Sequence, residues 1–379
     1  MYEGNDRPGG SLTDVPGVLV GHYQRRGRGW RTGTTVILTP GGATCGVDVR
    51  GGVPGTRETD LLRPENLVTQ VHGVCLTGGS AYGLGAADGV MRWLESQGIG
   101  YPVGTEAYEI VPIVPAVVIF DLGRGGSFAN RPDHTFGFNA AHRARRSRFA
   151  TGAVGAATGA IAGGLQGGLG TASQRLSSGI TVAAIAVVNS VGTVINPRTA
   201  LPWELAGVQL RKPNRDDRRR LGELAEPLKA PLNTTIGVVA TTATLSKAEC
   251  SKVAAVAHDG LSRAIRPAHT LFDGDTIFAL ATGHADLIET AAEEGFTSRS
   301  SRAAQLSEIA EAGAACFARA CTQAIVFAQA SKSGPPAYRD LCRSAFATQA
   351  LSTEPSTEPS TARSTARSTA RSTALSRNK

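Results

Sequence analysis

The junction between Asn233 and Thr234 is where residue type and spacing best combine to support covalent chemistry. A charged, proline-bearing segment, residues 208–231, is followed by the β-branched apolar stretch Thr234–Thr242. On spacing alone, the favoured interpretation is a strand that starts after an asparagine turn. The sharper hypothesis is self-cleavage. A free α-amine on Thr234, with an ordinary pKa of about 7.7–8.0, would act as the general base for the hydroxyl of the same residue.

Other catalytic and binding patterns are incomplete. Gly78–Gly83 follows a strand-like run and opens a helical one, but its spacing is not G-x-G-x-x-G, and the first lysine of the chain is Lys212. The seven histidines form no HxxxH or HxH pair. Asp273-Gly274-Asp275 fits a calcium loop badly, and no G-x-S-x-G elbow is present. We therefore expect no metal, no organic cofactor and no separate Ser-His-Asp triad.

The elements that must position this junction alternate between strands and helices. Apolar β-branched runs predict strands, and the capping box Ser246-Lys-Ala-Glu249 predicts a helix start. Ser80 is expected to be the N-cap of another helix. The expected strands are Thr34–Thr39, Val71–Thr77, Ile180–Asn189, Thr234–Thr242 and Thr276–Thr282, and the expected helices run from Ser80 to Gln97, from Ser246 to Ile265 and over Arg302–Ala330. Buried strands mixed with long helices predict a layered α/β sandwich.

Composition narrows the class of protein. Of the 379 residues, 41% are hydrophobic and 18% charged, so most of the chain is expected to fold. No apolar run reaches transmembrane length, and the N-terminal residues are polar and glycine-rich, so we expect a cytoplasmic protein without a membrane segment. The six cysteines form no CxxC pair and are expected to be buried or free thiols.

The C-terminal residues 351–379 form a four-residue repeat that reads STEP, STEP, STAR, STAR, STAR, STAL. The repeat has no apolar periodicity, so we expect it to be disordered and to follow a single folded domain over residues 1–350. The repeat carries four Arg, one Lys and two Glu, which leaves +5 of the net charge of +8 for the other 350 residues. The basic spots there do not interleave aromatic residues, so no nucleic-acid partner is expected.

Several sequence blocks occur in an order that resembles one known family. They are Leu12–His22, Gly33–Val36, Val47–Asp60, Leu76–Leu84, Val111–Ala116, Val188–Asn189, Asn233–Val238, Ala257–Leu261 and Phe272–Asp275. Together they resemble the DmpA family of L-aminopeptidase/D-esterases, which also contains β-peptidyl aminopeptidases and the nylon-oligomer endo-hydrolase. The likeness spans roughly residues 11–342.

This resemblance implies a self-cleaving hydrolase with a four-layer αββα sandwich. The single domain would be assembled from an α chain, residues 1–233, and a β chain, residues 234–379. Such enzymes form homo-oligomers, often tetramers, need no metal or organic cofactor, and act on amide or ester bonds of small peptides or peptide-like substrates. Cleavage is expected at Asn233–Thr234.

The resemblance also assigns roles to individual residues. Thr234 matches the nucleophile and Asn233 the residue before the cut. Asn189 matches an asparagine whose amide helps to form the oxyanion hole, a type of donor that typically contributes about 10²–10³ in rate. Asp273 and Asp275 match acidic residues that hold the nucleophile and its new ammonium. Without the resemblance, Asn189 would be an ordinary strand-end asparagine, and the two aspartates would belong to a turn.

Four further residues are expected at the substrate cleft. Ser80 and Tyr82 lie in the helix-opening block of the family, while Gln166 and Phe120 lie near two departures from its pattern. Some members carry an active-site lysine in or near the glycine-rich segment that matches residues 152–170, where Gln166 stands near the corresponding place, and the family often has a tyrosine where Ile119-Phe120-Asp121 stands. Loss of an ammonium and a phenol would slow self-cleavage or shift the substrate.

Two alternative functions remain at this point. One is an acyltransferase of the ornithine acetyltransferase type, which also self-cleaves before a threonine. The other is a catalytically weakened structural member of the family, which the missing lysine and Phe120 favour.

Overall fold

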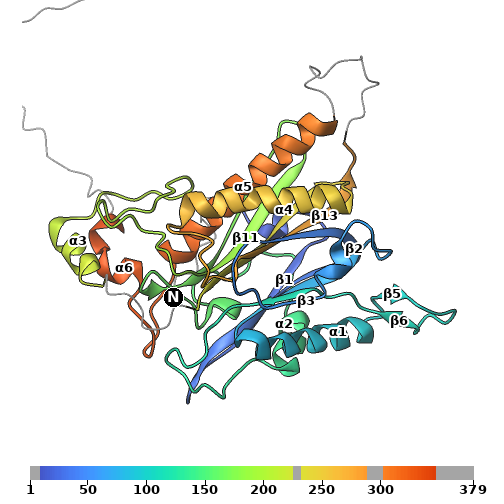
Figure 1. The fold of residues 1–379 in the computed structure, drawn as a ribbon, viewed down its shortest axis with the longest axis horizontal. Helices are drawn as coiled ribbons and strands as arrows, with labels where there is room; N and C mark the ends of the chain where they lie inside the picture. Colours follow the sequence, from blue (N-terminus) through green and yellow to red (C-terminus); the bar gives the residue numbers. More distant parts are fainter. Residues whose placement is uncertain (1–8, 225–231, 288–301, 347–379) are drawn as a thin grey trace, which may run out of the picture. The chain divides into compact units, whose positions relative to one another are not determined.

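A computed structural model describes residues 9–224, 232–287 and 302–346 of the chain. The repeat predicted over residues 351–379 lies outside these residues. The strands follow the hydrogen-bonded order β10-β11-β12-β13-β2-β4-β7-β3, with β1 beside β2 (Figure 1). The main strands are β1 (Leu19–Gly27), β2 (Trp30–Val49), β3 (Thr56–Arg57), β4 (Val71–Thr77), β7 (Ala116–Val118), β10 (Gly168–Arg175), β11 (Thr181–Asn189), β12 (Thr234–Ala243) and β13 (Thr276–Ala285).

The long strand β2 belongs to two layers. Its first part, around Thr34–Leu38, pairs with β1 and β4, while its last part, Thr44–Val49, pairs with β13. Neighbouring strands are antiparallel except β12 with β13 and β4 with β7, which are parallel. The chain therefore forms a β1-β2-β4-β7-β3 layer and a β10-β11-β12-β13-β2 layer.

Side chains alternate between the two faces of each strand, and this alternation builds three apolar layers. In β11, Ile185 and Val187 face the other sheet, whereas Ala184 and Val188 face the helices. In β12, Val238 likewise belongs to the core between the sheets. A third core lies between the β1-β2-β4 layer and its own helices. The predicted αββα sandwich is confirmed, since two sheets pack face to face and helices cover both outer faces (Figure 1).

Two pairs of helices form the outer layers. Helices α1 (Ala86–Ser96) and α2 (His134–His142) cover one sheet, while α4 (Lys247–Ala264) and α5 (Arg302–Val326) cover the other. The predicted capping box opens α4, because Ser246 accepts from the backbone of Glu249 and the Glu249 carboxylate accepts from the backbone of Ser246. None of the helices in the described part of the chain has the length and apolarity needed to cross a bilayer.

Two local predictions were wrong. Ser80 does not cap α1. Its φ is +52°, and it follows the left-handed Gly79 into a 3-10 turn, Ser80–Gly85, that precedes the helix. The segment 208–231 is not only an exposed linker, because its residues 215–222 form helix α3. The side chain of Asn214 caps α3, and the buried carboxylate of Asp217 accepts two hydrogen bonds from Ser344, so tertiary contacts hold this polar helix in place.

The remaining elements are short. They are strands β5 (Tyr101–Pro102), β6 (Ile110–Val111), β8 (Ile161–Ala162) and β9 (Leu165–Gln166), helices α3 (Arg215–Gly222) and α6 (Tyr338–Leu341), and 3-10 turns at Leu12–Asp14, Asp60–Leu62, Ser80–Gly85, Gly155–Ala157 and Arg343–Phe346. All six cysteines are free and buried.

Candidate active site

Three neighbouring strand ends bring the junction residues together. Thr234 is the first residue of β12 and lies directly opposite Asn189, the last residue of β11. Asn233 forms a parallel bridge with Asp273, just before β13 begins. Asn233 and Thr234 are both buried. The order of the strands, β11-β12-β13, therefore gathers residues that are far apart in the sequence.

The carbonyl group of Asn233 receives two hydrogen bonds. One comes from the hydroxyl of Thr234, the next residue, and the other from the backbone N–H of Gly274 at 3.0 Å. A Cβ at Gly274 would lie 2.7 Å from the carbonyl oxygen of Val53 and 3.0 Å from Thr234 Oγ1, so glycine is required there for close packing. A backbone donor on this carbonyl favours negative charge on its oxygen.

Two carboxylates lie beside the junction, Asp273 at the position bridged to Asn233 and Asp275 at the backbone N–H of Thr235. Asp275 accepts from the backbone N–H of Thr235 at 2.7 Å through one oxygen, and from Nδ1 of His269 at 2.8 Å through the other. Asp273 accepts from the hydroxyl of Thr270 at 2.5 Å. Burial raises the pKa of Asp273, and the nearby charge of Asp275 raises that pKa further. We call Asp273, Asp275 and His269 the carboxylate cluster.

His269, a member of this cluster, was not predicted from the sequence. Its backbone has a φ of +55°, and its N–H donates to Asp275 at 3.1 Å, so the residue is bound to that carboxylate twice. Its ring packs edge-on against His258 with centroids 4.9 Å apart. Burial lowers the pKa of His258 to about 4. His258 is therefore neutral near pH 7, and its ring adds no positive charge beside the cluster.

Arg124 lies on the Asn233 side of the same bond. Its Nη1 donates to Asn189 Oδ1 at 2.8 Å, and its Nη2 donates at 2.6 Å both to the carbonyl of Leu232 and to Oδ1 of Asn233. Asn189 Oδ1 also accepts from the backbone N–H of Ile161 at 3.0 Å. Because these two donors fix the oxygen, the orientation of the Asn189 amide is fixed as well.

The amide nitrogen of Asn189 consequently has an acceptor other than the Asn233 carbonyl. It donates to the backbone carbonyl of Phe120 at 3.2 Å. In the uncleaved chain, then, the hydrogen bonds that reach the Asn233 carbonyl come from Gly274 and Thr234.

A second buried group of polar side chains surrounds Arg124. Arg31 donates to Gln166 Oε1 at 2.7 Å and to the backbone carbonyl of Arg124 at 2.6 Å. Asp121 accepts from the backbone N–H of Gly79 at 2.7 Å. Burial raises the pKa of Asp121 to about 6, although Arg124 and Arg31 oppose the shift. Burial also lowers the pKa of Arg124 to about 10, which leaves it charged at neutral pH. We call Arg31, Arg124, Asp121 and Gln166 the arginine cluster.

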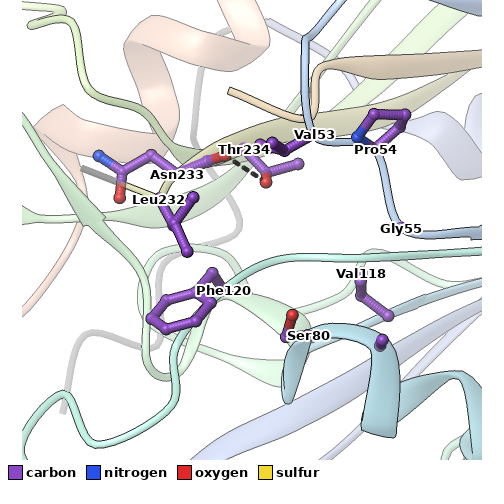
Figure 2. Close-up of a pocket in the computed structure, with 10 residues that line it drawn as sticks. Val53, Pro54, Gly55, Ser80, Val118, Phe120, Leu232, Asn233 and Thr234 are labelled. Carbon is purple, nitrogen blue, oxygen red and sulfur yellow. Dashed lines mark hydrogen bonds between the residues drawn. The ribbon is translucent and has the colours of Figure 1, made fainter. Parts of the chain in front are cut away.

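A pocket opens beside the junction (Figure 2). It has a volume of about 210 Å³. Figure 2 shows Asn233 and Thr234 on one side of the pocket and Phe120 and Ser80 on the other. Its lining consists of Val53, Pro54, Gly55, Ser80, Ala81, Val118, Phe120, Leu232, Asn233 and Thr234. Apolar groups dominate the walls, and the Thr234 hydroxyl is one of the few polar groups.

The residues expected at the cleft are not all gathered there. Ser80 and Phe120 line the pocket, whereas Tyr82 is 60% exposed and its ring is covered by the Arg131 guanidinium at 3.7 Å. Gln166 is fully buried and forms hydrogen bonds in the arginine cluster. Arg124 was missed, because nothing in its local Gly-Arg-Gly-Gly sequence indicates which distant segment it contacts.

The four-layer αββα sandwich is the architecture of the Ntn hydrolase fold. The solved L-aminopeptidase/D-Ala-esterase/amidase of Ochrobactrum anthropi, described as a variant of the Ntn hydrolase fold, has the same architecture. It superposes with a TM-score of 0.61, covers 88% of this chain and 91% of its own, and shares 20% sequence identity.

The chain belongs to peptidase family S58, whose model matches residues 10–335. An uncharacterized aminopeptidase of Mycobacterium tuberculosis is 49% identical over 351 residues, which cover 89% of this chain and 99% of the relative. A 6-aminohexanoate-oligomer endohydrolase of a Kocuria species is 33% identical over 288 residues, covering 73% and 76%. The predicted family is thus confirmed, and the protein is a hydrolase of peptide or amide bonds. Neither alternative function is favoured.

Proposed function

We propose that this chain cuts itself between Asn233 and Thr234 and then uses Thr234 as the nucleophile of an amidase or aminopeptidase. The observation that carries the proposal is the geometry of the Asn233 carbonyl. The hydroxyl of the following residue and the N–H of Gly274 both contact its oxygen, at the mouth of a pocket.

Self-cleavage would proceed as an N-to-O acyl shift. Thr234 Oγ1 attacks the carbonyl carbon of Asn233, and the tetrahedral oxyanion is held by Gly274 N–H at the position where that group already donates. The C–N bond then breaks, which leaves an ester on Thr234 and a free α-amine. Water hydrolyses the ester, so that Asn233 ends in a carboxylate and the Thr234 hydroxyl is restored.

Turnover would repeat this chemistry on an external substrate. The α-amine of Thr234 takes the proton of its own hydroxyl, Oγ1 forms an ester with the substrate acyl group, and the protonated amine product leaves. Water then releases the acid. Asp275 holds the strand start through Thr235 N–H, and it stabilises the terminal ammonium together with Asp273. Asn189 is proposed as an additional oxyanion donor through its amide nitrogen, while its Oδ1 stays hydrogen-bonded to Arg124 and to the backbone N–H of Ile161.

The substrates we propose are small peptides or peptide-like amides and esters. The names of the relatives support this range, since one is called an aminopeptidase and another an endohydrolase of 6-aminohexanoate oligomers. The residues matched to the cleft are Ser80, Tyr82, Phe120 and Gln166. Of these, Ser80 and Phe120 line the pocket. A homo-oligomer, with four processed protomers, and a cytoplasmic location remain part of the proposal.

Denaturing gel electrophoresis with N-terminal sequencing tests the proposal. The purified protein should give two fragments, and the smaller should begin at Thr234. Thr234→Ser should still be cut, because it keeps the hydroxyl. Thr234→Ala should remain one chain and should hydrolyse no p-nitroanilide. Cleavage of Thr234→Ala at the same bond would refute the role of this residue.

A further inference from the structure

Arg124 connects the acyl side of the proposed cut to the wall of the pocket. The Arg124 guanidinium donates to three of the acceptors described above. Two of them, the backbone carbonyl of Leu232 and Asn233 Oδ1, belong to the segment that ends at the proposed cut. The third acceptor, Asn189 Oδ1, lies at the end of β11. The guanidinium also packs 5.3 Å from the centroid of the Phe120 ring, which lines the pocket.

These contacts fall into two groups once the bond is cut. Leu232 and Asn233 must leave the position that an incoming acyl group will occupy, because Thr234 can attack only one carbonyl there. Asn189 and Phe120 stay, so the guanidinium remains positioned. It then carries donors without their former acceptors at a half-buried position, where a charged donor without a protein partner loses part of its stabilisation. The vacated site therefore favours a ligand that returns a hydrogen-bond acceptor to Arg124.

Asn233 itself indicates where that acceptor must be. Its Oδ1 is attached to the γ-carbon of the residue whose carbonyl is attacked, and it lies 2.6 Å from Arg124 Nη2. Its backbone N–H donates to the carbonyl of Phe272 at 3.0 Å, which is where the amine of a substrate residue would bind. A substrate residue with an oxygen on its γ-carbon reproduces both contacts.

We propose that Arg124 is a specificity-determining residue that binds the side chain of the substrate's acyl residue, so that the preferred substrates are amides of aspartyl and asparaginyl residues. This inference rests on the proposed function and adds a substrate class to it. The arginine cluster holds two guanidinium groups and one carboxylate, and through Arg124 it contacts the pocket-lining residues Phe120 and Asn233. This charge beside the pocket favours an anionic or strongly polar acyl side chain.

The test compares p-nitroanilides of aspartate, asparagine and leucine with the processed enzyme. Leucine has nearly the same shape as these residues but has no acceptor on its γ-carbon. We expect kcat/KM for the aspartyl and asparaginyl anilides to exceed that for the leucyl anilide at least about tenfold, the ratio given by about 1.4 kcal/mol. In Arg124→Met this ratio should fall at least tenfold, and in Arg124→Lys it should fall less. Arg92→Met, an exposed position on α1, should leave the ratio unchanged.

A wild-type preference for the leucyl anilide, an unchanged ratio in Arg124→Met, or no hydrolysis of any of the three by correctly cut enzyme would overturn the inference. If Arg124→Met is not cut into two chains, the ratio of kcat/KM values measured with the wild-type enzyme still tests the inference. A second test is inhibition of the wild-type enzyme by free aspartate, asparagine and leucine. Free aspartate and asparagine should then inhibit more strongly than leucine, and the reverse order overturns the inference. A wild-type chain that is never cut and hydrolyses nothing would instead refute the proposed function itself.

Discussion

Two buried polar clusters flank the same peptide bond, and they differ in charge and in construction. The carboxylate cluster reaches the Thr234 side through Asp275, which accepts from Thr235 N–H, and the arginine cluster reaches the Asn233 side through Arg124. The first comes from one short turn before β13. The second draws its members from three separate segments, at residue 31, at residues 121–124 and at residue 166.

The opposite charges of the two clusters match the groups that the proposed reaction forms or binds on each side of the bond. The amine side gains a positive charge when the bond breaks, and carboxylates stabilise it. The acyl side carries carbonyl oxygens, and guanidinium donors bind those. An amide hydrolase with this layout separates recognition of the acyl group from support of the nucleophile, so mutations in the two clusters should have separable effects.

The largest effect is expected from the carboxylate cluster. Asp275→Asn keeps an acceptor for Thr235 N–H but loses the charge that stabilises the Thr234 ammonium, so self-cleavage and turnover should each slow about 10²–10³-fold. A time course on a denaturing gel and kcat for a p-nitroanilide measure the two rates. Asp259→Asn, an exposed position on α4, is the matched control and should leave both unchanged. An unaltered rate in Asp275→Asn would remove this carboxylate from the mechanism.

The next largest effect concerns the free energy of unfolding and its pH dependence, to which Asp121 of the arginine cluster contributes. The folded-state pKa of Asp121 is raised to about 6, above its ordinary value of 3.8. The native state therefore keeps a proton that the unfolded chain has released, and stability falls as pH rises from about 4 to 6. At about 1.4 kcal/mol per pKa unit, the loss is at most about 2–3 kcal/mol.

The variant Asp121→Asn has no titratable carboxyl group at this position. Its free energy of unfolding should therefore lack this contribution to the decrease between pH 4 and 6. Urea unfolding at pH 4, 5, 6 and 7 measures the difference between variant and wild type. Parallel pH profiles for the two proteins would contradict the raised pKa.

A smaller effect is expected when Arg124 is removed from the uncut chain. Arg124→Met loses the three hydrogen bonds that position Leu232, Asn233 and Asn189, so self-cleavage should slow about 10–30-fold, which corresponds to about 1.4–2 kcal/mol. Cell-free synthesis followed by a gel time course gives the rate. Cleavage as fast as in the exposed control Arg92→Met would mean that Arg124 does not position the scissile bond.

The smallest effect is expected from Asn233 itself. Asn233→Ala deletes one acceptor of Arg124 and keeps the carbonyl, its Gly274 donor and the Thr234 hydroxyl. Self-cleavage should slow about 3–10-fold, which corresponds to about 0.7–1.4 kcal/mol, the usual net contribution of one hydrogen bond. In the double variant with Arg124→Met, the two effects should not add, because both remove the same contact. Additive effects would show that the residues act independently.

Much of the fold followed from local patterns. The runs Val71–Thr77 and Thr234–Thr242, and the capping box at Ser246, were recognised because strand periodicity and helix caps are encoded by neighbouring residues. Ser80 was assigned wrongly as a cap, because a left-handed glycine and a 3-10 turn come between it and α1. Helix α3 was missed, because its polar sequence depends on distant contacts such as that between Asp217 and Ser344.

The sequence by itself determined the family, the sandwich and the hypothesis of a threonine exposed by a cut, because these depend on residue order and local periodicity. Only the tertiary structure decided which groups meet the bond of the proposed cut. It brought Gly274 onto the Asn233 carbonyl and Arg124 onto both Asn233 and Asn189, and the turn before β13 brought His269 onto Asp275. The contacts of Gly274 and Arg124 join segments far apart in the chain, and their distances are set by sheet order and burial, which no local pattern encodes.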